Sequence, residues 1–164
     1  MPYGPEQNGV AERMNRTLTE RARSMHLNSG LPEEFWAEAL NMACYLVNRS
    51  PSVPLGLKLP QEVYTGRPVD FFGLRVFGCA AYHLVESHKR TKLEAKYKRC
   101  IFIGYQEGTK GYKMWDPTDK KVVISRNVTF DESELVKSVG HEEPKGQESE
   151  KVESPLEIEV QIKE

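Results

Sequence analysis

The sequence predicts an α+β protein in which helices precede a small sheet and an acidic tail follows it. Helical periodicity runs through residues 8–47, and short β-branched and aromatic segments fill residues 75–130. From Lys137 onward the chain has no aromatic residue. Its 164 residues match the length of about one ordinary domain.

The first helix is predicted to begin at Asn8, whose side chain suits an N-cap, and to end before Gly30 and Pro32. When successive residues are placed at 100° steps around the helix axis, one face of this helix is apolar. That face carries Val10, Met14, Leu18, Ala22 and Met25.

The second helix is predicted to begin near Pro32 and to end at Asn48, since Pro51 follows closely. Its apolar arc is wide, which indicates burial; it carries Phe35, Ala39, Met42, Ala43 and Leu46. Residues 51–73 are rich in Pro and Gly and read as a connector, with one helical turn over 60–64.

Five short strands are expected to follow within about 55 residues. This density of strands predicts a small barrel or a strongly bent sheet. They are expected at 75–84, 99–105, 111–115, 121–125 and 127–130. An aromatic set alternates along them, which favours barrel core over a base-stacking platform. The set is Tyr82, Phe102, Tyr105, Tyr112, Trp115 and Phe130.

The net charge of −1 hides two opposite segments. Residues 1–130 hold 19 basic and 13 acidic residues (+6), whereas residues 131–164 hold 4 and 11 (−7). The tail, residues 134–164, is predicted to be disordered, because it lacks the apolar surface to offset its ordering entropy. Within it, Leu156–Ile162 alternates apolar and polar residues, which suits a strand added to a partner.

No apolar run is long enough to cross a membrane, and no secretory signal is present. The three cysteines, Cys44, Cys79 and Cys100, form neither a disulfide framework nor a zinc motif and read as buried apolar residues. A nuclear or cytoplasmic location is therefore expected.

Two stretches carry candidate chemistry. Glu12 and Arg16 form either an ordinary i,i+4 ion pair or a carboxylate for Mg²⁺ beside arginines for phosphate. The run 86–99 is either a solvated loop or a surface that follows a phosphate backbone. Its candidate nucleic-acid-binding residues are Lys89, Arg90, Lys92, Lys96 and Lys98.

The segments GPEQNGVAERMNRTLTERARSM and LPEEFWAEALNMACYLVNRSP resemble the end of the integrase catalytic core of Copia-type (Ty1/copia) LTR retrotransposons. LRVFGCAAYHL and KYKRCIFIGYQEGTKGYKMWDPTDKKVVISRNVTFDE resemble the SH3-like domain that follows it in the same Pol polyproteins. The resemblance covers residues 3–133. It implies a partial catalytic core (1–50), a linker (51–73), an SH3-like β-barrel (74–133) and the tail.

That resemblance implies an RNase H-like fold and DDE-type polynucleotidyl transfer, with Glu12 as the catalytic and metal-binding third acidic residue. The two aspartates would lie upstream, so Mg²⁺ or Mn²⁺ is expected in the intact enzyme and no cofactor or catalysis in this chain alone. Glu6 stands where the family has Gln, which would weaken DNA binding. The first-helix residues expected on DNA are Asn8, Asn15, Arg16 and Arg23.

The expected function is that of a truncated integrase fragment that binds DNA weakly through its backbone and docks to integrase subunits. The alternative is an SH3-like protein-interaction module in a relic or host-used reading frame. A third expectation is that the second helix, without the core sheet, exposes the apolar face around Phe35 and Leu46 and drives association.

Overall fold

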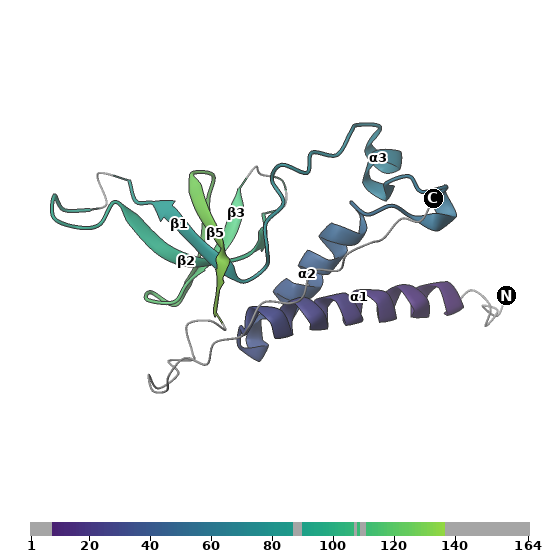
Figure 1. Ribbon diagram of the computed structural model, residues 1–164, viewed down its shortest axis with the longest axis horizontal. Helices are drawn as coiled ribbons and strands as arrows, with labels where there is room; N and C mark the ends of the chain where they lie inside the picture. The colour runs from purple at the N-terminus through teal and green to yellow at the C-terminus, as the bar shows by residue number, and fades with distance from the viewer. Residues whose placement is uncertain (1–7, 87–89, 107, 109–110, 137–164) are drawn as a thin grey trace, which may run out of the picture.

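The protein is described from a computed structural model, which covers residues 8–86, 90–106, 108 and 111–136. The helices come first (Figure 1). They are α1 (Asn8–Ser29), the 3₁₀ turn η2 (Glu33–Phe35), α2 (Trp36–Val47), η3 (Val53–Leu55) and α3 (Pro60–Thr65). The strands are β1 (Cys79–Leu84), β2 (Tyr97–Tyr105), β3 (Tyr112–Asp116), β4 (Lys121–Ser125) and β5 (Val128–Leu135).

The strands form one antiparallel sheet in the order β4-β3-β2-β1-β5. The predicted strands are all present, although β1 begins at Cys79 rather than Arg75. Strand β5 extends beyond Phe130 to Leu135, because Asp131 and Leu135 pair with Ala80 and Cys79 across an irregularity in β1. The strand therefore crosses the predicted tail boundary at residue 134; residues 137–164 lie outside the described residues.

One face of the sheet packs against the helices, and the two parts share a hydrophobic core. Phe35 is 6% exposed and meets Trp115 of β3 edge to face, with 5.3 Å between ring centroids. Ala39, Met42 and Ala43 of α2 are buried in the same core. The expectation that this helix face stays exposed is wrong, because the antiparallel sheet covers it.

Four rings of the aromatic set form one cluster in the sheet, namely Phe102, Tyr105, Tyr112 and Phe130, whereas Trp115 faces the helices. Phe102 is fully buried and makes edge-to-face contacts with Tyr105, Tyr112 and Phe130. Phe102 thus lies in the core, and Tyr105, Tyr112, Trp115 and Phe130 pack partly buried against it, as predicted, whereas Tyr82 is half-buried outside that cluster. Cys79 and Cys100 are buried beside them, as predicted, and burial raises the pKa of their thiols to about 12 and about 11.

The end of α1 touches the start of the sheet at Gly78. A Cβ added there would lie 2.3 Å from Cβ of Ser29, and Gly78 has φ +83°. Ser29 is itself fully buried, and its hydroxyl donates to the His26 carbonyl and accepts from the Leu31 amide. Only glycine fits this contact, so the approach of helix and sheet depends on it.

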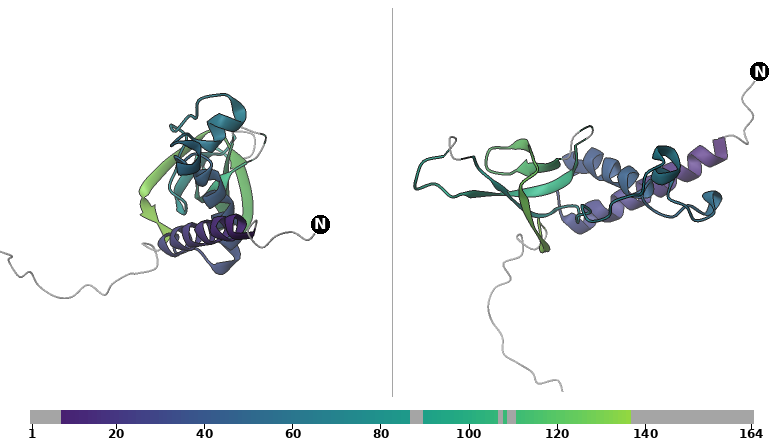
Figure 2. Two further views of the ribbon diagram at one scale, coloured as in Figure 1. Left: turned by 90° about the vertical axis from the view of Figure 1, so that its right-hand side faces the viewer. Right: turned by 90° about the horizontal axis from the view of Figure 1, so that it is seen from above.

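The first half of α1 extends away from this core (Figures 1 and 2). Ala22 is buried, and Leu18 and Met25 pack against the core, but Val10 and Met14 are 73% and 48% exposed. The predicted apolar face is thus covered only along its C-terminal part. No helix of the described residues is long and apolar enough to cross a membrane. The RNase H-like assignment of residues 1–50 stays a prediction.

Candidate nucleic-acid interface

The predicted residues of α1 share one exposed stripe. At 100° per residue, these side chains fall within an arc of roughly 100° around the helix axis. Every member is exposed, and none takes part in an ion pair within the described part of the chain. The stripe, named here the α1 stripe, consists of Asn8, Glu12, Asn15, Arg16, Thr19 and Arg23.

Arginine side chains in such a stripe are suited to phosphate. A guanidinium donates two parallel hydrogen bonds to phosphate oxygens, and asparagine amides add uncharged donors. The buried side of α1, marked by Ala22 and Ser29, lies roughly 80° around the helix axis from the middle of the stripe. Packing against α2 therefore leaves the stripe open, and the Glu12–Arg16 ion pair considered from the sequence does not form.

Glu12 alone does not make a metal site. Across the residues that the structure describes, no three His, Cys, Asp or Glu side chains cluster as metal ligands would. Mg²⁺ favours carboxylate ligands together with water and phosphate oxygens. The described residues therefore do not fit a resident Mg²⁺ or Mn²⁺, and Glu12 would need carboxylates from elsewhere.

The basic run divides into exposed and paired residues. Lys92 and Lys96 are exposed in the β1–β2 connection, whereas Arg90 is half-buried, and its buried Nε has no hydrogen-bond partner among the described residues. Lys89 lies outside the described residues. Lys98 differs from the exposed lysines, since its Nζ lies 2.6 Å from Oδ2 of Asp116 and 2.8 Å from Oδ2 of Asp119, and its role on nucleic acid stays a prediction.

The Lys98 contacts belong to a structural ion-pair cluster at the β3–β4 turn. The Asp116 side chain is 0% exposed, and its Oδ1 accepts hydrogen bonds from the amides of Thr118 and Asp119. Burial opposes ionisation of Asp116, but these bonds and Lys98 outweigh it and lower its pKa. Hydrogen bonds from Lys121 and Lys98 lower the pKa of Asp119 to about 2. The cluster holds the turn, and a phosphate would compete with two carboxylates for the Lys98 ammonium.

A second ion pair links β2 to β5, which lie on either side of β1 in the sheet. Nη2 of Arg99 lies 2.6 Å from Oε1 of Glu134, whose other oxygen accepts from the Tyr82 hydroxyl. Sequence reasoning placed Glu134 in the disordered tail. Because β5 lies beside β1 in the sheet, the Glu134 side chain reaches both Tyr82 of β1 and Arg99 of β2, a contact that the sequence alone does not indicate.

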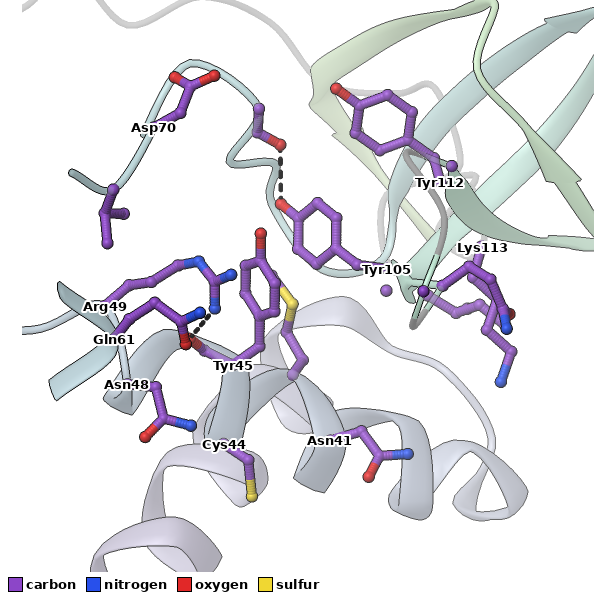
Figure 3. A pocket seen from close by; sticks show the side chains of 18 of the residues that line it. Asn41, Cys44, Tyr45, Asn48, Arg49, Gln61, Asp70, Tyr105, Tyr112 and Lys113 are labelled. Atoms are coloured by element: carbon purple, nitrogen blue, oxygen red, sulfur yellow. Dashed lines mark hydrogen bonds between the residues drawn. The ribbon is translucent and has the colours of Figure 1, made fainter. Parts of the chain in front are cut away.

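The structure also contains a groove that the sequence did not indicate (Figure 3). It encloses about 1480 Å³ between α2, residues 61–73 and the β2–β3 end of the sheet. Tyr45 stacks on Tyr105 with 4.1 Å between centroids, and the Arg49 guanidinium lies 3.4 Å from the Tyr45 centroid. Burial raises the pKa of both tyrosine hydroxyls.

The two predicted basic sets lie at opposite ends of the molecule. In Figures 1 and 2 the β1–β2 connection projects from the end of the sheet that lies away from the start of α1. The fold therefore brings Asn15, Arg16 and Arg23 into one stripe but does not join them to Lys92 and Lys96. A single short contact cannot use both sets.

Comparison with known proteins places this fold among retroelement proteins. Residues 79–144 match the retroviral polymerase SH3-like domain. The chain is 53% identical over 135 residues to the retrovirus-related Pol polyprotein from transposon TNT 1-94 of Nicotiana tabacum, covering 82% of this chain and 10% of that protein. It is 36% identical over 131 residues to the Pol polyprotein from transposon RE2 of Arabidopsis thaliana, covering 80% and 9%. An uncharacterized mitochondrial protein of Arabidopsis thaliana is 42% identical over 69 residues, covering 42% and 58%.

The sheet and the domain match define a retroelement protein with an SH3-like domain. The chain belongs to the retrovirus-related Pol polyproteins of transposons, as the resemblance predicted. It spans about a tenth of the length of the Pol polyproteins it matches.

Proposed function

We propose that this part of the Pol polyprotein contributes to DNA integration by holding the DNA backbone on the α1 stripe. The observation that carries the proposal is the set of exposed polar side chains along one face of α1, which form no ion pair within the described residues and include Arg16 and Arg23 two helical turns apart. Membership of the Pol family supports a role with DNA, since such elements insert DNA copies of themselves.

The expected binding is electrostatic and weakly selective for sequence. Each phosphate neutralised by arginine releases counterions, so affinity falls with salt at a slope of about 0.9 per contact. Two contacts predict a loss of roughly twelvefold between 50 and 200 mM salt. The exposed Lys92 and Lys96 would add contacts only on DNA long enough to reach the far end of the sheet.

Catalysis is not proposed for this chain by itself. Glu12 lies within the stripe and would act as one acidic ligand of a DDE site completed by two aspartates from other residues of the polyprotein. The divalent metal would supply charge stabilisation at the reacting phosphate once that set is complete. Of this site, the described residues contain only Glu12, which is exposed on α1 one helical turn before Arg16.

The test compares two double variants of equal charge. Arg16→Ala with Arg23→Ala removes the stripe, whereas Arg21→Ala with Arg126→Ala removes two exposed arginines that lie outside it. Fluorescence anisotropy with a labelled duplex at 50 mM salt should show at least tenfold weaker binding for the stripe variant only. Equal weakening by both variants would show a response to net charge and overturn the proposal.

A second candidate, protein docking, is favoured by the groove of Figure 3. Its volume exceeds that of a small-molecule pocket, which is roughly 300–1,000 Å³, and suits a peptide segment. Integrase subunits are the proposed partner, and the exposed Val10 and Met14 offer them a second apolar contact.

Substitutions in the groove and in the α1 stripe separate protein docking from DNA binding. Asn41→Arg, at the exposed rim of the groove, should abolish capture of a fuller integrase and leave DNA binding unchanged. The Arg16→Ala with Arg23→Ala variant should do the reverse. Reversing the charge of Lys98 is unsuitable as a test of DNA binding, because it would break the ion pair with buried Asp116.

A further inference from the structure

Strand β4 forms one edge of the sheet and carries an apolar strip at that edge. Within the described residues it pairs only with β3, so its outer backbone groups have no strand partner. Val122 and Ile124 are 46% and 52% exposed, and both lie on the sheet face shared by Trp115. An unprotected edge of this kind invites another strand.

The sequence contains a strand of matching pattern outside the described residues. Leu156–Ile162 alternates, with Leu156, Ile158, Val160 and Ile162 at one parity and Glu157, Glu159 and Gln161 at the other. In a strand, the first set would occupy one face. We propose that residues 156–162 add to the β4 edge as a sixth strand, with their apolar face continuing that of Val122 and Ile124.

Charge favours β4 over the other free edge. Lys120 and Arg126 flank β4 as basic residues, beside Lys121, which pairs with Asp119. Strand β5 instead carries Asp131, beside Glu132 and Glu134, which pair with Arg75 and Arg99. The glutamates of the added segment are attracted to the first edge and repelled by the second over distances of about a Debye length, roughly 10 Å. The charges of the segment thus favour pairing with β4 over pairing with β5, the other edge strand of the described sheet.

Chain length permits the connection. Strand β5 ends at Leu135, and residues 137–155 can span roughly 60 Å when extended. Four interstrand spacings separate β5 from β4, which is about 19 Å across a flat sheet and less across a bent one. Tethering also raises the effective concentration of the segment to the millimolar range, so weak pairing suffices.

The experiment is backbone amide hydrogen exchange on the full chain. Ile158→Pro removes a strand hydrogen-bond donor and prevents regular pairing, while Ser149→Pro makes the same change outside the segment. Amides of residues 121–125 that face away from β3 should exchange at least tenfold faster in Ile158→Pro than in the parent or in Ser149→Pro. Neither variant touches the described core, so folding is preserved.

Three outcomes would overturn the proposal. Equal exchange in all proteins would mean that the segment does not pair. Faster exchange confined to β5 would mean that the wrong edge was assigned. Protection of β4 that rises with protein concentration and survives Ile158→Pro would mean that two copies pair through this edge.

Discussion

Replacing Gly78 with alanine tests how the helices and the SH3-like sheet are joined. The new methyl group would lie 2.3 Å from Cβ of Ser29, which is fully buried, and the backbone at Gly78 has φ +83°. The left-handed conformation costs an L-residue about 1–2 kcal/mol, and overpacking costs a further ~1–3 kcal/mol. We expect Gly78→Ala to lower the free energy of unfolding by about 3 kcal/mol.

The matched control is Gly56→Ala, which has φ +63° but no atom within 4 Å of the added Cβ. It should show the conformational cost alone, so the two variants should differ by about 1–3 kcal/mol. Urea unfolding followed by tryptophan fluorescence reports both sides of the contact, because Trp36 is in α2 and Trp115 is in β3. Equal losses in the two variants would refute the close packing of α1 against the sheet.

Two further predictions concern the ion-pair cluster at the β3–β4 turn. Asp116→Ala removes two amide hydrogen bonds and the partner of Lys98, so it should cost about 2–4 kcal/mol. Asp116→Asn retains an acceptor for the amides and should cost about 1–2 kcal/mol; urea midpoints measure both, and equal costs would contradict the role of the two amide hydrogen bonds. The pKa of Asp119 falls from its ordinary value near 4 to about 2 on folding, so its stabilisation is present above pH 4 and is lost as pH falls through 2. Asp119→Asn should therefore flatten the loss of stability between pH 5 and pH 2, and an unchanged pH dependence would contradict this assignment.

Local sequence patterns predicted most element positions because their determinants are local. Helix α1 begins at Asn8 and ends before Gly30, and β4 occupies the predicted residues 121–125. The end of β5 was missed, since Asp131–Leu135 is acidic and joins the sheet only through its pairing with β1. Such pairing is a tertiary effect that overrides strand propensity.

The candidate site was predictable only where it lies on a single element. Helical periodicity places Glu12, Arg16 and Arg23 on one face without knowledge of the fold. The pairing of Lys98 with Asp116 depends on the packing of β2 beside β3, and the groove depends on α2 lying against β2. The wide apolar arc of α2 predicted burial, but nothing local indicated that the SH3-like sheet would cover it.

The most direct test of the central claim is the salt dependence of duplex binding by the full chain. For Arg16→Ala with Arg23→Ala, the slope of log K against log salt should become shallower by about 1.8, which corresponds to two lost phosphate contacts. The Arg21→Ala with Arg126→Ala control should keep the parent slope. A stripe variant with the parent slope would contradict DNA binding through α1.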